Sequence, residues 1–294
     1  RAEILPDFSR RTPVVDPDDH HLFTSLGCAA ENFALAAAAR GRHADIRFDA
    51  AEDGRIAIEL ADAPAEETEL LAAILQRQCT RSVYDGRAVS AEDLARLEQA
   101  ARAEGLQLLL VTKKQKIENV LEYVIAGNTA QMNDPAFIRE LKSWLRFNER
   151  EALAARDGLF SAASGNPTIP SWLAGLVFRF AFTTGGENDR YAGQVRSSSG
   201  IAIFVSDRSD KAHWVNAGRS VQRFALQATA LGIRHAFVNQ PLEVVQVRAE
   251  FANWLGLSGD QRPDLIVRYG YAPLMPKSLR RPVEAVLVPA GRGG

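Results

Sequence analysis

Two short basic clusters hold the side chains best suited to bind an anion. The first is RQCTRSVY, residues 77–84, in which Arg77 and Arg81 stand four residues apart with Gln78 and Cys79 between them. Guanidinium forks together with hydroxyl or thiol donors match the oxygens of a phosphate monoester. The pattern therefore indicates a phosphate-binding segment, placed where a helix should end and a loop should begin.

The second cluster is KSLRRP, residues 277–282, which follows the last strongly apolar strand pattern. It contributes Lys277, Arg280 and Arg281. Taken alone, either cluster is more often a solvated surface than a binding site. The anion-binding interpretation gains weight only if the fold brings the two clusters together.

No arrangement of side chains typical of nucleophilic or metal-dependent catalysis stands out. There is no Walker loop, no GxGxxG motif after a strand and no hydrolase pattern. Cys28 and Cys79 form no metal motif. The sequence thus predicts no catalytic side chain and no metal site. The histidines lack metal-ligand spacing and are interpreted as solvated or structural: His20, His21, His43, His213 and His235.

The composition of the 294 residues is that of an ordinary globular chain, with 46% hydrophobic and 24% charged residues. A formal net charge of −1 gives no global attraction to nucleic acid or to an anionic membrane. No stretch approaches the length of a transmembrane span, and the N-terminus lacks a signal-peptide pattern. We therefore expect a protein of the reducing cytoplasm.

A long amphipathic helix, expected at residues 214–232, occurs in the chain twice. GCAAENFALAAAARG at 27–41 matches GRSVQRFALQATALG at 218–232 with an offset of 191, and seven of fifteen positions are identical. Two alanine-rich helices can resemble each other by composition alone. The matching terminal glycines and the shared Phe-Ala-Leu favour an internal duplication, with the two copies packed as a pseudo-dimer.

The remaining patterns alternate between helices and strands and place the basic clusters at element ends. Residues 157–196, rich in Gly, Pro, Ser and Thr, are interpreted as a lid-like insertion with one short helix near Trp172. We expect strands at 1–6, 45–48, 55–60, 106–111, 201–205, 236–239 and 264–271, and helices at 24–41, 66–78, 90–104, 116–132, 134–147, 214–232 and 242–255.

The chain resembles the FMN-dependent nitroreductase superfamily, specifically its Acg-like branch, in which one chain carries two nitroreductase-like halves. Family members open a half with an Arg-x-Ser-x-Arg stretch, and here Arg77, Cys79 and Arg81 stand in those places, with Cys79 replacing Ser. In the family, a half ends with a Lys/Arg pair that follows a strand containing Gly-Tyr. Here the Gly-Tyr is Gly270-Tyr271, and the basic cluster at 277–282 follows it.

The resemblance implies that both basic clusters grip the phosphate of one FMN, the closing cluster through Lys277, Arg280 and Arg281. It also implies a hydrogen bond to flavin N5. The donor would be a backbone amide at the end of the strand expected at 236–239, which follows the helix at 214–232. Asn239 and Gln240 occupy that place, where the family often has an acidic residue and Gly.

The implied architecture is an α+β sandwich with a nitroreductase-like fold. We expect a first half at 1–65, N-terminally incomplete relative to the family, and a second half at 66–294 that includes the insertion. The halves form an intramolecular pseudo-dimer with one flavin site, as a monomer or a homodimer.

The implied function is NAD(P)H-dependent reduction of nitro or quinone compounds through bound FMN, with a small electron acceptor as second substrate. A rival is a flavin-sequestering protein of the Acg-like type, in which the insertion is closed over the ring. A third possibility is a degenerate fold that binds no flavin.

Overall fold

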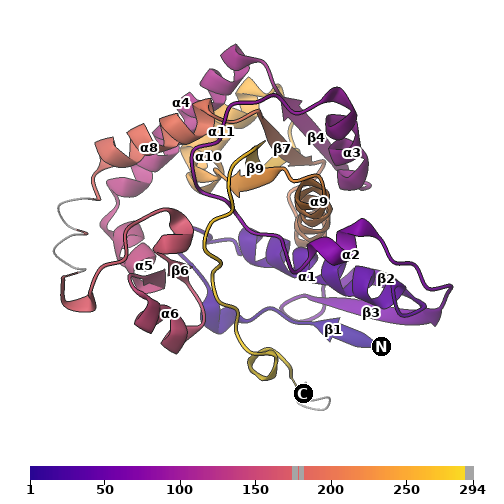
Figure 1. Cartoon of the computed structure of the whole chain (residues 1–294). Coiled ribbons are helices and arrows are strands. Elements are labelled where there is room, and N and C mark those ends of the chain that lie inside the picture. Colours follow the sequence, from indigo (N-terminus) through magenta and orange to yellow (C-terminus); the bar gives the residue numbers. More distant parts are fainter. Residues whose placement is uncertain (174–177, 179–181, 289–294) are drawn as a thin grey trace.

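The computed structural model describes residues 1–173, 178 and 182–288, and has the expected α+β class. In Figure 1, a three-stranded sheet and α1 form one side of the molecule, and a four-stranded sheet forms the other, with α9 between α1 and that sheet. The strands are β1 (Ala2–Ile4), β2 (Arg42–Asp49), β3 (Arg55–Asp62), β4 (Leu106–Val111), β5 (Leu145–Arg146), β6 (Leu159–Phe160), β7 (Gly200–Ser206), β8 (Arg234–Phe237) and β9 (Arg262–Gly270).

The helices cover both faces of the larger sheet. α3 and α9 lie on one face, and α4, α8, α10 and α11 on the other. Their bounds are α1 (His20–Ala38), α2 (Glu69–Ala73), α3 (Ala91–Ala101), α4 (Lys114–Met132), α5 (Pro135–Trp144), α6 (Glu149–Ala155), α8 (Thr184–Arg196), α9 (Lys211–Ala230), α10 (Gln240–Glu243) and α11 (Val245–Trp254), with 3-10 turns at Phe8–Arg10, Ala162–Ser164 and Val283–Ala285.

The repeated helices cross each other at one glycine from each copy. A Cβ added to Gly27 would lie 2.0 Å from the carbonyl oxygen of Val215, and one added to Gly218 would lie 1.9 Å from that of Thr24. Both contacts are far inside van der Waals distance, so only glycine lets the two backbones come this close. The contact is reciprocal: Val215 lies three residues before Gly218, and Thr24 lies three residues before Gly27.

The two larger sheets share one strand order. In the first, β1 leads through α1 to β2 and β3, with the order β1-β3-β2. In the second, β7 leads through α9 to β8 and β9, and these strands have the order β7-β9-β8, with β4 added beyond β7. All neighbours in both sheets are antiparallel. Each long helix ends before a glycine with positive φ, Gly41 at +69° and Gly232 at +72°.

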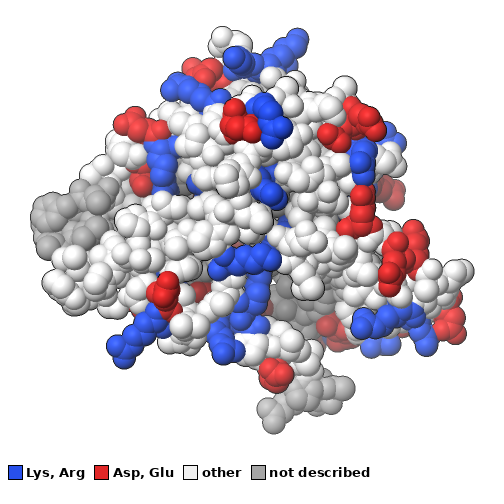
Figure 2. All heavy atoms as spheres, viewed as in Figure 1, with Lys and Arg blue, Asp and Glu red and all other residues white. Residues whose placement is uncertain are grey.

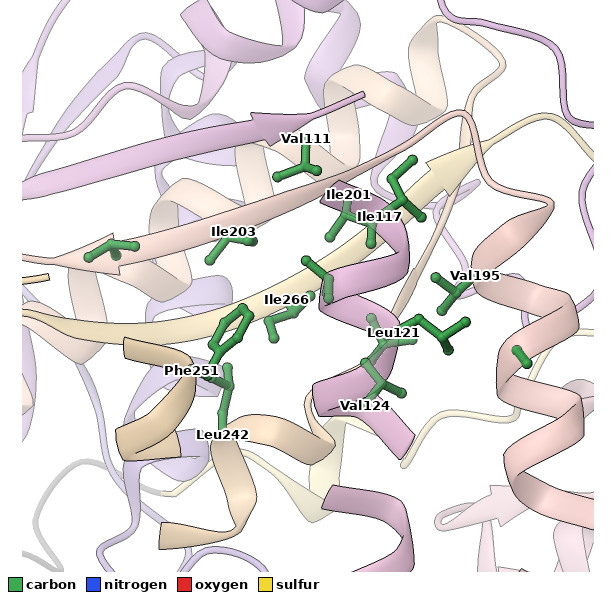
Figure 3. Close-up of a cluster of buried hydrophobic side chains, with 14 residues drawn as sticks. Val111, Ile117, Leu121, Val124, Val195, Ile201, Ile203, Leu242, Phe251 and Ile266 are labelled. Atoms are coloured by element: carbon green, nitrogen blue, oxygen red, sulfur yellow. The ribbon is translucent and has the colours of Figure 1, made fainter. Parts of the chain in front are cut away.

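Burial in the core accounts for the apolar sequence of β7 and for the apolar run 265–267 of β9. Both strands are buried along their whole length, because helices cover both faces of the sheet. Figure 3 shows Ile203 and Ile266 facing Phe251 of α11 and Leu121 of α4. The opposite face carries Phe204, which packs edge-to-face against Phe224 of α9.

The helix expected at 66–78 is much shorter, since α2 ends at Ala73. The chain then becomes extended, and Cys79 forms a parallel bridge with His235 on the free edge of β8. The Thr80 amide donates to the His235 carbonyl oxygen at 2.8 Å. Long-range pairing at a sheet edge thus replaces the local helix preference, and it places the first basic cluster on a sheet-like segment.

Other expectations also differ from the structure. The strand expected at 236–239 ends at Phe237, because α10 begins at Gln240. The helix expected at 242–255 is interrupted at Val244, whose backbone is extended. The insertion contains α8, which the sequence did not predict because its glycines weaken the helix pattern; Thr183 caps it by accepting from the Gly186 amide. The short helix expected near Trp172 lies partly outside the described residues.

Within the part of the chain that the structure describes, no helix is both long and apolar enough to span a bilayer.

Candidate functional site

The two basic clusters meet in one cleft of about 670 Å³. Figure 2 shows Lys and Arg side chains gathered near the middle of this face, where the C-terminal segment of Figure 1 crosses the molecule. The cleft is within the size range of small-molecule sites. Seven of the nine predicted site residues line it, namely Arg77, Gln78, Cys79, Arg81, Lys277, Arg280 and Arg281.

Hydrogen bonds hold the C-terminal segment against the first cluster. The Gln78 side-chain oxygen accepts from the Met275 amide at 3.0 Å. The Lys277 ammonium donates to the Leu75 carbonyl oxygen at 2.7 Å. Gln78 therefore joins the two segments rather than standing free in the cleft, and hydrogen bonds from one side chain of each cluster to the other segment's main chain hold the clusters together.

The cleft has a strong excess of positive charge. Six cationic side chains line it and only one carboxylate, Asp157, which is already paired with Arg10 and with Arg146. Arg281 is paired with Asp7 at 3.3 Å. Within the described residues, no side-chain hydrogen bond or ion pair engages the guanidinium groups of Arg77, Arg81 or Arg280. The cations on the lining are Arg77, Arg81, Arg156, Lys277, Arg280 and Arg281.

Burial and the nearby charge of Arg77 lower the pKa of Arg280. Like charges held together in a partly desolvated cleft disfavour their own ionised forms. A bound dianion would relieve this repulsion, and guanidinium forks match phosphate oxygens. The electrostatics of the cleft therefore favour a phosphate group.

Arg156 is a cleft residue that the sequence did not single out. It ends α6 in the left-handed conformation, with φ at 52°. Gly158 follows with φ at +72°, and a Cβ there would lie 2.3 Å from the Trp144 carbonyl oxygen. This tight turn brings Arg156, at the end of α6, and Asp157, the first residue of the insertion, to the cleft. The only sign of this turn in the sequence was the Asp157-Gly158 pair.

Arg268 holds the first basic cluster in place from within the core. Its side chain is fully buried on β9 and donates to the carbonyl oxygens of Thr80, Ser82 and Gln194 at 3.2, 2.9 and 3.3 Å. The guanidinium also lies over the Tyr84 ring at 4.1 Å. Burial lowers the pKa of Arg268. The sequence signal was a single arginine inside the apolar strand DLIVRYGY.

His235 lies behind the cleft as a neutral side chain. It is 1% exposed, and neither ring nitrogen has a hydrogen-bond partner among the described residues. Burial, with the positive charges of Arg77, Arg234 and Arg81, lowers its pKa to about 3. The first basic cluster therefore acts on the core beneath it as well as on the cleft.

Asn239 and Gln240 do not line this cleft. The Asn239 side-chain oxygen accepts from the Ile266 amide at 2.9 Å, which ties the end of β8 to β9. Gln240 is buried. Its backbone packs closely against Gly127 of α4, where an added Cβ would lie 2.4 Å from the Gln240 carbonyl oxygen. Their predicted contact with a flavin ring remains a prediction.

No family model matches the chain. It is similar to a protein described as "Putative NAD(P)H nitroreductase" in two strains of Mycobacterium tuberculosis, CDC 1551 and H37Rv. The identity is 25% over 295 residues, covering 96% of this chain and 80% of the relative in each case.

Among solved structures, it is similar to the NADPH:FMN oxidoreductase of Vibrio harveyi complexed with NAD⁺, with 12% identity, 76% and 77% of the two chains covered, and a TM-score of 0.48. It is also similar to an FMN-bound nitroreductase of Desulfitobacterium hafniense, with 16% identity, 76% and 98% covered, and a TM-score of 0.46. The similarity to the mycobacterial relatives over nearly the whole chain supports the nitroreductase superfamily, and the α+β architecture agrees with a nitroreductase-like fold.

Proposed function

We propose that the cleft binds the phosphate of FMN and that the protein is an NAD(P)H-dependent oxidoreductase acting on nitro or quinone compounds. One observation carries the proposal most directly. Two basic clusters from distant parts of the chain share one cleft, and Arg77, Arg81 and Arg280 lack a carboxylate partner within the described residues. The similarity to proteins described as NAD(P)H nitroreductases gives the reaction class.

The donors that line the cleft fit a flavin mononucleotide. Arg77, Arg81 and Arg280 would hold the phosphate dianion, and Lys277 would add charge from the closing segment. When bound, FMN supplies two-electron chemistry between a reduced nicotinamide and an acceptor. The role of the chain is then to bind and orient, which agrees with the lack of a catalytic constellation in the sequence.

We further propose that the chain consists of two related halves, as in the Acg-like branch, divided near residue 65. Three observations support this proposal: the offset of 191 between the repeated helices, the shared strand order β1-β3-β2 and β7-β9-β8, and the reciprocal contact of Gly27 with Gly218. The interface between α1 and α9 then corresponds to the subunit interface of a symmetric dimer.

The test uses one purified sample of the full chain. We expect it to be yellow or to take up FMN, and to oxidise NADPH or NADH in the presence of a nitroaromatic compound or a quinone. If the protein does not bind FMN, the proposal is wrong. If it binds FMN that neither nicotinamide reduces under anaerobic conditions, the flavin-sequestering function replaces the enzymatic one.

A further inference from the structure

A second cluster of polar side chains lies at the start of α1, away from the basic cleft. Asp16, His20 and His21 each offer one ligand atom, and these atoms all lie within 4.8 Å of one another. They line a hollow of about 280 Å³ together with Asp18 and Glu243. The hollow shares no lining residue with the basic cleft. The sequence pattern gave these histidines no metal-binding role.

Local structure fixes the three groups beside each other. Asp16 precedes α1 and accepts hydrogen bonds from the amides of His21 at 2.9 Å and Leu22 at 3.0 Å. This cap holds its carboxylate against two consecutive histidines in the first turn of the helix. Asp16 is 4% exposed and His20 is 1% exposed. The carboxylate and the imidazole are thus buried side by side rather than solvated.

Each histidine has a carboxylate on its other side. His20 Nε2 lies 2.9 Å from Asp264 Oδ1, and among the described residues no hydrogen bond engages Nδ1, which can therefore bind another partner. The Ser206 hydroxyl donates to the second oxygen of Asp264. Histidines that bind metals commonly donate their second ring N–H to a carboxylate, which fixes the ring and raises its basicity.

His21 repeats this arrangement less tightly. Its Nε2 lies 3.6 Å from Glu243 Oε1, and the Gln131 amide donates to Glu243 Oε2 at 2.6 Å. Both carboxylates are therefore oriented by a further hydrogen bond. A helix cap alone would account for Asp16, but not for a buried carboxylate behind His20 and a half-buried one behind His21.

The charges around the hollow suit a dication. Arg248 and Arg262 contribute positive charge, and Arg262 is paired with Asp18 at 2.8 Å. The four carboxylates are Asp16, Asp18, Glu243 and Asp264. Around the two histidines, carboxyl groups thus outnumber guanidinium groups by four to two, and this excess of oxygen ligands favours a cation.

We propose that Asp16, His20 and His21 bind a divalent transition-metal ion of the zinc class. Imidazole and carboxylate ligands are typical of zinc, at about 2.0–2.2 Å. Two such ligands on one ion can be at most about 4.4 Å apart. The ligand atoms of Asp16, His20 and His21 lie within 4.8 Å of one another, about 0.4 Å more than this separation. A small movement of the side chains would therefore complete the site.

The ion would have a structural role. Asp16 and the histidines belong to the N-terminal part, Asp264 lies on β9, and Glu243 lies at the end of α10. Binding would therefore tie the start of α1 to the larger sheet. The proposal is independent of flavin, because no residue of the basic cleft takes part.

The test uses the full chain, stripped with a chelator, and zinc chloride alone as the probe. We expect one zinc ion per chain by elemental analysis, and a midpoint of thermal unfolding that rises with zinc. Cobalt substituted for zinc should give visible absorption bands of a nitrogen- and oxygen-ligated ion. A stripped wild type that takes up no zinc in stoichiometric amount overturns the proposal.

Two variants assign the ligands. His21→Gln, at a half-buried position, and Asp16→Asn, which keeps an oxygen for the helix cap, should each weaken zinc binding at least about tenfold, in the range found when metal-site residues are removed. His213→Gln is the control, because His213 also contacts a carboxylate, Asp210 at 2.8 Å, but belongs to no such group of three. If His21→Gln and Asp16→Asn fold and bind zinc like the wild type, the assignment is wrong. If they do not fold, zinc stoichiometry and cobalt absorption of the wild type decide.

Discussion

Arg280 lies within electrostatic reach of Arg77, although one belongs to the closing segment of the chain and the other to its first third. The proximity depends on the Gln78–Met275 and Lys277–Leu75 hydrogen bonds, which bind the two segments together. The repulsion between the two guanidinium groups is present in the free protein. A ligand with two negative charges would convert this repulsion into attraction.

Removing a cleft arginine should therefore weaken FMN more than it weakens the fold. We expect Arg280→Ala to raise the Kd for FMN about 10- to 100-fold, the loss of one charge-assisted contact of about 1.5–3 kcal/mol. The thermal midpoint should stay the same or rise, since repulsion with Arg77 is removed. Fluorescence titration of FMN measures the Kd, and Arg96→Ala, an exposed arginine paired with Glu69, is the control. An unchanged Kd would place the phosphate elsewhere.

Arg268 should matter for both stability and FMN affinity. Arg268→Met removes the charged donor to the carbonyl oxygens of Thr80 and Ser82; the Thr80 oxygen keeps the Tyr84 hydroxyl as a donor, whereas the Ser82 oxygen loses its side-chain partner. The loss should cost about 2–4 kcal/mol of unfolding free energy. Arg268→Lys keeps the charge but cannot span the same carbonyl groups, so it should weaken FMN while losing less stability. Urea unfolding and FMN titration check these effects, with exposed Arg208→Met as the control. Wild-type FMN affinity in Arg268→Lys would show that Arg268 does not position the segment.

The glycine crossing should be intolerant of a single methyl group. Gly27→Ala or Gly218→Ala would place a Cβ about 2 Å from a carbonyl oxygen, so the helices must separate, at a cost of about 3 kcal/mol or more. The double variant should lose less than the sum, because one separation accommodates both groups. Gly193→Ala, in α8 with open space around it, should be neutral or stabilising by about 0.4–1 kcal/mol. Denaturant unfolding of the four variants checks these values.

Acid should destabilise the protein partly through His235. Its folded pKa of about 3 lies below the unfolded value of about 6.5, so the unfolded state binds the proton first. This stability is complete above pH 6.5 and is lost as pH falls from there toward 3. From pH 7 to pH 5 the histidine should account for about 2 kcal/mol of lost unfolding free energy.

Unfolding of His235→Gln at the two pH values isolates this contribution. The variant should lose about 2 kcal/mol less than the wild type between pH 7 and pH 5. His43→Gln, at an exposed position, should retain the full wild-type loss. An equal loss in His235→Gln and the wild type would mean that the imidazole is solvated or paired.

Local signals predicted the elements that local chemistry determines. The strand at 106–111 agrees with the structure to the residue, and Ser90 caps α3 by accepting from the Asp93 amide. The apolar spacing also predicted α9 and α4 to within a few residues. In these segments the helix or strand preference and the burial pattern point the same way.

What the sequence missed depends on partners far along the chain. The helix at 66–78 ends early because the edge of β8 pairs with Cys79, and no local pattern reports that edge. Arg268 gains its role from carbonyl groups almost two hundred residues earlier. The contact of His20 with Asp264 could not be predicted locally either, because Asp264 comes from β9. The convergence of the two basic clusters was expected from a family resemblance, since spacing alone could not place them together.

The reciprocal contact of Gly27 and Gly218 has a consequence for how the molecule could be divided. The stretch at 63–67 is largely exposed and connects the first sheet to α2. A chain cleaved there would yield two fragments whose mutual recognition is already encoded in the helix crossing. The lining of the basic cleft lies wholly in the second fragment. We therefore expect reassembly to restore the helix crossing and the ion pairs that Asp7 and Arg10 make with cleft residues, rather than the cleft itself.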